Sequence, residues 1–316
     1  MHKNKRLILA APRGFCAGVK RAVEMAAAAV RRYGAPVYCL NEIVHNRQVV
    51  ASLEGLGVVF VRQPREAPEG AVLLFSAHGV PPEVRRQCRE RCLRVIDATC
   101  PFVDKVHREV RDYAARGYTI LLIGKRGHDE ILGVAGEAPE QVTLITDVTD
   151  ARAVTVPDPR RVALVTQTTL SGSETDDLQS LLRQRFPDLA MPRRGDICYA
   201  TLNRQRAVRA LAQQAPLVLV LGSSNSSNSL RLVEVAQTAG AAACLVERIE
   251  QLSKIVRGAP DILGLTAGAS VPDPFITEVV ARLAALGYCR VEEICVAAED
   301  MLFELPPDLR EMPVSR

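Results

Sequence analysis

The sequence predicts an α/β protein built from three similar domains, each with a parallel sheet. Short apolar runs, typical of strands buried on both faces, alternate with longer amphipathic runs typical of helices. The same order of helix, strand and polar loop also follows each of Cys16, Cys100 and Cys198. Recurrence of this kind indicates repeated structural units of about a hundred residues rather than one irregular fold.

Each repeat contains the same expected elements in the same order. The amphipathic helices are expected at 19–32, 103–115 and 203–213, and the strands that follow them at 37–40, 119–123 and 217–221. A second strand is expected at 72–75, 162–165 and 262–265. We therefore place the domains at 1–99, 100–197 and 198–286. The tail, 287–316, has no counterpart in the repeat and is expected to fold back over the functional site.

Composition and charge narrow the class of protein. The 316 residues are 48% hydrophobic and 24% charged, as in ordinary globular proteins. A net charge of +4 without a basic stripe favours a small anionic ligand and argues against nucleic acid. The apolar run 7–11 is too short for a secretory signal, and no stretch reaches the length of a membrane span. We expect a cytoplasmic protein whose nine cysteines are not disulfide-bonded.

Polar loops follow the carboxyl ends of the expected strands, where open parallel sheets bind ligands. After the first strand of each repeat come His45, His128 and Ser226, which lie 29, 28 and 28 residues beyond the repeat's cysteine. After the second strand come His78, Thr168 and Ser270, at offsets of 62, 68 and 72. These matched positions predict one cavity, lined in addition by Glu130, Ser227 and Asn228.

The three matched cysteines predict a metal centre. Each precedes a helix, where the positive end of the helix dipole favours the thiolate that binds metal. Cys88 and Cys92 also have a spacing that can bind metal, but the arginines around them favour a solvated basic helix.

Three soft thiolates suit zinc or an iron–sulfur cluster. The chain lacks the Cys-x-x-Cys pairs common in structural zinc sites. A cubane cluster usually takes four cysteines, so three leave one iron able to bind substrate as a Lewis acid. Two alternatives stay open: a hydrolase with a three-cysteine zinc and an open water position, and a non-catalytic iron–sulfur sensor.

The segment Ser226-Ser227-Asn228 precedes a helix and offers hydroxyl, amide and backbone donors to an anion. Ordinary helix capping is the alternative. Histidines opposite would add positive charge for a phosphate or diphosphate. Neither a P-loop nor a Gly-x-Gly-x-x-Gly motif is present. Glu130, the one acidic residue in the set, is expected to be a proton donor, with helix capping as its alternative role.

The chain resembles the 4-hydroxy-3-methylbut-2-enyl diphosphate reductase (IspH/LytB) family over nearly its whole length. The matching segments are RGFCAGV at 13–19, EIVHN at 42–46, SAHGV at 76–80, DATCP at 97–101, TQTTLS at 166–171, DICYAT at 196–201, NSSNS at 225–229, TAGAS at 266–270 and FELP at 303–306. One departure is Asp129 between His128 and Glu130, where the family more often has Pro or Ala; it puts only the local loop shape in doubt.

This resemblance implies three α/β domains in a pseudo-threefold arrangement around a central [4Fe-4S] cluster, bound by Cys16, Cys100 and Cys198, with one iron lacking a protein ligand. It implies a diphosphate held by His45, His78, Ser226, Asn228 and Ser270, with His128, Thr168 and Ser227 completing the pocket and Glu130 as proton donor. The implied reaction, the last step of the non-mevalonate isoprenoid route, replaces the allylic hydroxyl and gives isopentenyl and dimethylallyl diphosphate. An electron donor such as ferredoxin or flavodoxin is the implied partner.

Overall fold

The computed structural model describes residues 5–310, except for the side chains of residues 173 and 174. Within this range the chain forms two compact units. The first comprises 5–17, 45–49 and 198–302, and the second comprises 18–44, 50–197 and 303–310. No helix in the described range is long and apolar enough to cross a membrane.

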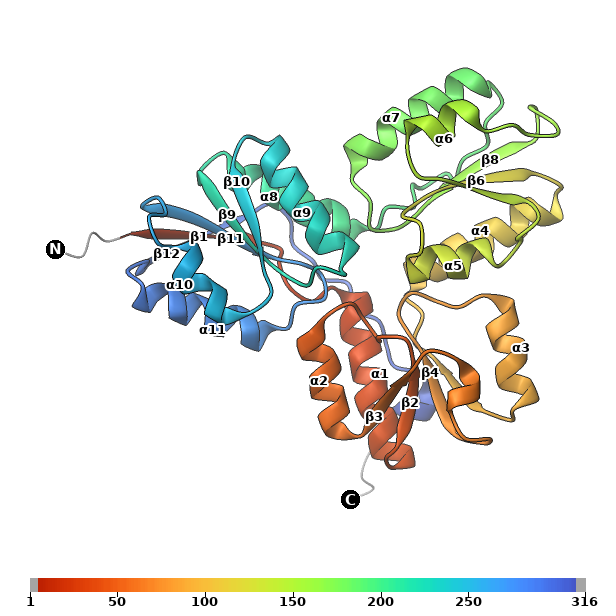
Figure 1. The fold of residues 1–316 in the computed structure, drawn as a ribbon, viewed down its shortest axis with the longest axis horizontal. Coiled ribbons are helices and arrows are strands. Elements are labelled where there is room, and N and C mark those ends of the chain that lie inside the picture. The colour runs from red at the N-terminus through yellow and green to blue at the C-terminus, as the bar shows by residue number, and fades with distance from the viewer. Residues whose placement is uncertain (1–4, 311–316) are drawn as a thin grey trace. The chain divides into compact units, whose positions relative to one another are not determined.

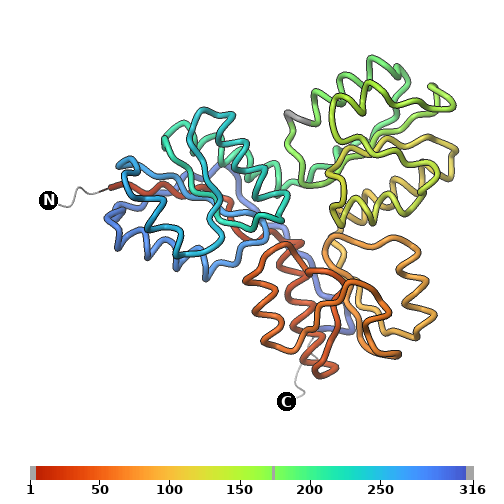
Figure 2. The backbone as a smooth tube through the Cα atoms, in the orientation of Figure 1, coloured from red at the N-terminus to blue at the C-terminus, as the bar shows by residue number. Residues whose placement is uncertain are grey.

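The first unit contains one five-stranded sheet in which every neighbouring pair is parallel, with the order β10-β9-β11-β1-β12. Its strands are β1 (Arg6–Ala11), β9 (Leu217–Leu221), β10 (Ala242–Val246), β11 (Ile262–Ala267) and β12 (Arg290–Cys295). Figure 2 shows the N-terminal strand, in red, running among the strands of the C-terminal third of the chain.

Helices cover both faces of this sheet (Figure 1). One face packs against α8 (Tyr199–Ala212) and α9 (Ser227–Thr238), and the other packs against α10 (Leu252–Ile255) and α11 (Asp273–Ala285). Because successive strand residues point to opposite faces, Leu7 joins the core beneath α11 and Ile8 joins the core beneath α8. Burial of each such side chain contributes about 1.5–3 kcal/mol. A 3₁₀ turn, Ile249–Gln251, precedes α10.

The second unit contains two smaller parallel sheets. One has the order β3-β2-β4-β5, and the other has the order β7-β6-β8. The strands are β2 (Val37–Leu40), β3 (Val58–Val61), β4 (Val72–Phe75), β5 (Arg94–Asp97), β6 (Thr119–Ile123), β7 (Val142–Ile145) and β8 (Val162–Thr166). Two 3₁₀ turns, Pro64–Glu66 and Pro307–Leu309, complete it.

The helices associated with these sheets are α1 (Ala17–Tyr33), α2 (Arg47–Leu56), α3 (Pro82–Glu90), α4 (Pro101–Ala115), α5 (Asp129–Ala135), α6 (Val148–Ala153) and α7 (Gly172–Arg185). The three-stranded sheet is covered on one face by α4 and α5 and on the other by α6 and α7 (Figure 1). Leu122 and Ile123, adjacent on β6, contribute to the two different cores.

The three sheets share a core topology. The strand after each cysteine-led helix is central: β2 lies between β3 and β4, β6 between β7 and β8, and β9 between β10 and β11. The later strand on one side of this centre, β4, β8 or β11, leads to the second polar loop of the repeat. The prediction of an α/β fold with three similar parallel sheets is confirmed.

Sheet membership differs from the sequence-based division at both ends of the chain. β1 lies in the range 1–99 and β12 in the tail 287–316, yet both belong to the sheet of the third repeat. β1 inserts between β11 and β12, and an ion pair of 2.6 Å joins Arg6 to Glu292 across the β1–β12 pair. Pairing of strands so far apart in sequence is not encoded in the local hydrophobic period, which is why the repeat did not reveal it.

Candidate functional site

The three repeat cysteines occupy the same local position in their respective folds. Cys16 directly precedes α1, Cys100 precedes α4 with an extended backbone (φ −61°, ψ 134°), and Cys198 precedes α8 (φ −70°, ψ 153°). None of the three forms a disulfide, all are half-buried, and the Cys198 sulfur accepts from the Thr201 amide at 3.4 Å. Helix N-termini favour thiolates, and three accessible soft donors suit iron–sulfur ligation. The donor set therefore fits the cluster that the family resemblance implies.

The Cys88 and Cys92 pair is not arranged as a metal site. α3 ends at Glu90, and Cys92 lies beyond it in a left-handed conformation, φ 51°. Cys88 is fully buried in an apolar core, and this burial raises the pKa of its thiol. The helix is thus only partly solvated, because its Cys88 face is a packing surface.

In the first unit, the Cys16 loop is fixed beside the end of β11. The Cys16 and Gly14 amides donate to the carbonyls of Ala269 and Ala267, both at 3.2 Å. Tyr199, the first residue of α8, is close enough to sense Cys16: burial, and then the negative charge of Cys16, raise the pKa of the phenol to about 12. The phenol therefore stays protonated at neutral pH, and the starts of α1 and α8 are neighbours in this unit.

The polar loop at α9 supplies the capping that its sequence predicts. The Ser226 hydroxyl caps the helix by accepting from the Ser229 amide at 3.3 Å, and the Ser229 hydroxyl lies 3.1 Å from the Ser226 hydroxyl. Capping does not account for Asn228, whose side-chain nitrogen and oxygen are both buried without a hydrogen-bond partner. Asn228 as a whole is 5% exposed. A buried amide without a partner is costly, so this side chain is suited to a ligand.

Two glycines permit the close packing of this loop. A Cβ at Gly222 or Gly268 would lie 2.1 Å or 2.2 Å from the Ser229 hydroxyl oxygen. Ser227, at the start of α9, is buried as well. Ser270, in the loop after β11, donates its hydroxyl to the His45 carbonyl at 3.1 Å. The loops of His45 and Ser270, predicted to be neighbours, are in contact within this unit.

In the second unit, Glu130 is buried in the first turn of α5. The Thr168 amide donates to Oε1 of this carboxyl at 2.6 Å, and the Thr168 hydroxyl donates to Oε2 at 2.9 Å. Thr168 follows β8 and Glu130 follows β6, so the two polar loops of the second repeat meet at this carboxyl. Glu130 is not the helix cap, because His128 occupies that position and its Nδ1 accepts from the Glu130 amide at 3.1 Å.

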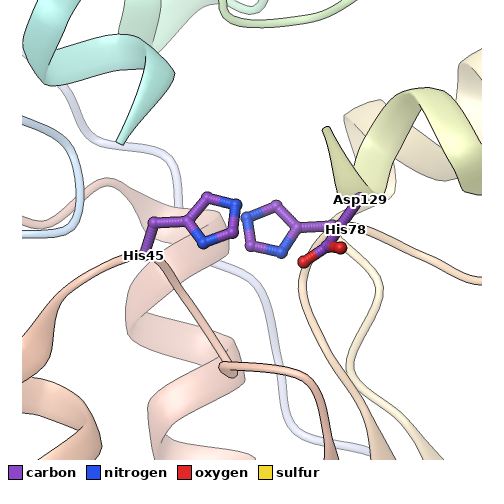
Figure 3. Close-up of side chains that lie close together, drawn as sticks. All are labelled: His45, His78 and Asp129. Carbon is purple, nitrogen blue, oxygen red and sulfur yellow. The ribbon is translucent and has the colours of Figure 1, made fainter. Parts of the chain in front are cut away.

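His78 belongs to the same cluster of side chains. Its ring lies 5.6 Å from the His128 ring in a T-shaped arrangement, and its Nδ1 lies 3.3 Å from the Ser76 hydroxyl. The side-chain atoms of His78 and Asp129 that could hold a metal are within 4.8 Å of each other, and Figure 3 draws both side chains. Asp129, the position at which the chain departs from the family pattern, accepts from the side-chain amide of Asn41 at 3.4 Å.

Cys100 is tied to the His78 loop through its backbone, because its amide donates to the Ala77 carbonyl at 3.0 Å. The segment after residue 302 lies nearby in the second unit. Phe303 packs against Phe102 with ring centroids 6.2 Å apart, and Arg21 donates both to the Glu304 carbonyl and to that of Thr99. The FELP segment therefore contacts Phe102, two residues after Cys100, and is linked through Arg21 to Thr99, the residue before Cys100.

His107 is a packing residue that the repeat pattern does not indicate. It lies on α4, is buried, and pairs through Nδ1 with Glu137 at 2.7 Å. A Cβ at Gly79 would lie 2.6 Å from its Nε2, and a Cβ at Gly133 would lie 3.2 Å from its ring. His107 thus fills the space between the His78 loop and α5.

Comparisons with known protein sequences agree on one family. The family model of the LytB protein matches residues 7–284. A protein of Leifsonia xyli named 4-hydroxy-3-methylbut-2-enyl diphosphate reductase is 52% identical over 310 residues, covering 97% of this chain and 91% of its own. A reductase of the same name from Mycobacterium tuberculosis (strain ATCC 25618 / H37Rv), numbered 2, is 51% identical over 307 residues, covering 97% and 92%.

Solved structures agree as well. The E-1-hydroxy-2-methyl-but-2-enyl-4-diphosphate reductase of Plasmodium falciparum has a TM-score of 0.93 at 34% identity, with 97% of each chain covered. A second structure, of (E)-4-hydroxy-3-methyl-but-2-enyl diphosphate reductase, is described as the terminal enzyme of the non-mevalonate pathway. It has a TM-score of 0.64 at 32% identity, covering 89% of this chain and 99% of its own.

Proposed function

This chain belongs to the LytB protein family, and on that premise we propose that it is the oxidoreductase that removes the hydroxyl of (E)-4-hydroxy-3-methylbut-2-enyl diphosphate. Two electrons and two protons enter, the allylic C–O bond breaks, and one water leaves. A hydrogen added at one end or the other of the allylic unit gives isopentenyl or dimethylallyl diphosphate. This is the last step of the non-mevalonate route.

We infer that Cys16, Cys100 and Cys198 hold one [4Fe-4S] cluster, in which one iron has no protein ligand. The observation that carries the proposal is the shared position of these three half-buried cysteines, each directly before a helix and none in a disulfide. When bound, such a cluster supplies the electrons and a Lewis-acidic iron for the hydroxyl. An electron donor such as ferredoxin or flavodoxin and a location in the cytoplasm remain predictions.

We assign the diphosphate to His45, His78, Ser226, Asn228 and Ser270, with His128, Thr168 and Ser227 completing the pocket. Asn228 gives the strongest support, because a diphosphate oxygen would accept from the amide nitrogen that is buried without a partner. Anions are also favoured at the start of a helix, where α9 presents Ser226 and Ser227. Several fixed contacts to one end of a small substrate orient its reacting end.

Glu130 is the proposed proton donor, and its contacts indicate which oxygen carries the proton. Oε1 faces the Thr168 amide, which can only donate, so that oxygen must accept. Oε2 faces the Thr168 hydroxyl, which can donate or accept. A proton on Oε2 is therefore compatible with both contacts, and the Thr168 hydroxyl is placed to orient or relay it.

The test is analysis of anaerobically purified protein for iron and acid-labile sulfide, followed by spectroscopy with and without the diphosphate substrate. We expect iron and sulfide, a spectral change at one iron on adding substrate, and formation of both products with a chemical reductant. Zinc without iron would instead support the three-cysteine zinc hydrolase. A cluster without turnover of the substrate would support the sensor.

A further inference from the structure

A buried arginine links the two cysteine-bearing elements of the first unit. Arg204 lies on α8, six residues after Cys198, and is fully buried. Its Nε and Nη2 donate to the Gly14 carbonyl at 3.2 and 2.7 Å. Its Nη1 donates to the Ala200 carbonyl at 3.0 Å and to both carboxylate oxygens of Glu299 at 3.1 Å. All three guanidinium nitrogens are therefore engaged.

The loop that contains the Gly14 carbonyl has little freedom to move. Gly14 has φ +70°, and a Cβ there would lie 2.8 Å from Ile276 and 3.2 Å from the Val271 carbonyl. The amides of Gly14 and Cys16 are already committed to the end of β11. Arg204 therefore holds this loop from the α8 side, two residues before the Cys16 thiol.

Glu299 brings the C-terminal segment into the same contact. It follows β12 and accepts from Asn203 at 3.2 Å as well as from Arg204. A buried arginine is stable only when its charge is paired and its donors are satisfied. Glu299 supplies that charge, so the segment after β12 is part of what fixes the arginine between the Cys16 loop and α8.

We propose that Arg204, fixed by Glu299, is a positioning residue that sets the separation of the Cys16 and Cys198 thiolates for the cluster. The inference rests on the proposed function, since it concerns two of the three assigned cluster ligands. Arg204 touches neither thiol in the hydrogen bonds described, and it acts on one ligand through the Gly14 carbonyl and on the other through the helix that Cys198 begins.

The test compares Arg204→Met, Glu299→Gln and the control Arg206→Met, whose arginine is exposed on the same helix. Each full-length protein is reconstituted anaerobically, and iron release to a chelator is timed. Because residues that orient metal ligands typically change metal affinity by about 10- to 100-fold, we expect Arg204→Met to release iron faster by that factor. Glu299→Gln should show a smaller increase, and Arg206→Met should match wild type.

Two readouts separate positioning from a general loss of stability. In the apo-protein, a short bifunctional thiol reagent should join Cys16 to Cys198 in lower yield in Arg204→Met than in Arg206→Met, as mapped by mass spectrometry. At equal cluster occupancy, the electron paramagnetic resonance spectrum of the reduced Arg204→Met protein should also differ from that of wild type. Glu299→Gln carries the same two readouts if Arg204→Met does not fold.

The outcomes distinguish a failure of this inference from a failure of the proposed function on which it rests. Wild-type protein that takes up no iron and sulfide would overturn the proposed function and this inference with it. A wild-type cluster together with unchanged release rate, cross-linking and spectrum in the variants would overturn the role of Arg204 alone.

Discussion

Thr168 holds both carboxylate oxygens of Glu130, one through its backbone amide at 2.6 Å and one through its hydroxyl at 2.9 Å. The two residues lie 38 positions apart: Glu130 is in the first turn of α5, which follows β6, and Thr168 follows β8 of the same sheet. A buried carboxyl gripped at both oxygens has one fixed orientation. This geometry gives the proposed proton donor a defined direction before substrate binds.

Replacing Glu130 by Gln tests the acid directly. Gln keeps the size of the side chain but cannot deliver a proton, and positioned acids contribute about 10²–10⁴-fold to rate. We expect turnover of the diphosphate to fall at least about 100-fold with iron and sulfide content unchanged. Glu140→Gln, at an exposed position, is the control. Full activity in Glu130→Gln would leave the sensor as the better description.

Thr168→Val separates orientation of the acid from its presence. Valine matches the shape of threonine and keeps the amide contact to Oε1, but it loses the hydroxyl contact to Oε2. Misplacement of a catalytic group can cost about 10- to 100-fold, so kcat should fall by that factor. Thr168→Ser should restore most of it, and Thr143→Val on the exposed side of β7 should change nothing. Equal rates for the Val and Ser variants would show that the hydroxyl has no role.

Asn228→Leu should weaken substrate binding without weakening the fold. The wild-type amide is buried with both polar atoms unpaired, so an apolar side chain of similar size removes an unfavourable burial of about 1 kcal/mol or more. We expect the apo-protein to unfold at the same or a higher temperature, while calorimetry shows at least about tenfold weaker binding, the loss of roughly one hydrogen bond to a charged group.

Ser226→Ala provides the contrast to Asn228→Leu. It removes the α9 cap, which typically costs about 1 kcal/mol of stability, so its unfolding temperature should fall. If Asn228→Leu lowered stability as Ser226→Ala does, and left affinity intact, the amide would have a structural role.

Local sequence patterns were sufficient to predict the strands and helices that are specified by their own residues. β2, β4, β6 and β9 begin and end at the residues expected, because a short apolar run between polar loops can be little else than a buried strand. Each of the three cysteines lies directly before its helix, because an amphipathic run follows it in the sequence. The repeated order of loops then placed Thr168 in the same predicted cavity as Glu130, because Thr168 occupies the second polar loop of its repeat.

Contacts between segments that are distant in sequence cannot be predicted from local patterns. Nothing near Arg204 in sequence indicates that its guanidinium is buried against Gly14 and Glu299, because the same helix carries two further arginines, Arg206 and Arg209, that are exposed. Ser229 has no distinguishing position in the repeat either, although its hydroxyl is enclosed by Gly222 and Gly268. The role of such a residue depends on the groups that it contacts in the folded chain. No periodicity in the sequence predicts those contacts.

Glu109 gives a pH dependence of stability whose sign follows from its surroundings. Burial, and then the nearby negative charge of Asp196, raise the pKa of this carboxyl from 4.5 to about 7, although Lys105 lies 3.0 Å away and opposes the shift. In the unfolded chain the carboxyl ionises near 4.5. The folded state therefore binds more protons between these values, and its stability falls as pH rises. The contribution of Glu109 is fully present below about pH 4.5 and is lost as pH rises through about 7.

Glu109→Gln should remove this dependence. Gln stays neutral at every pH, so the variant should match wild type near pH 4.5 and unfold at a higher temperature than wild type at pH 8. Glu54→Gln, at an exposed position on α2, should follow the wild-type curve throughout. The measurement is the thermal midpoint of the apo-protein at a series of pH values. A Glu109→Gln curve parallel to that of wild type would mean that the carboxyl ionises at its ordinary pKa and that Lys105 offsets the charge of Asp196.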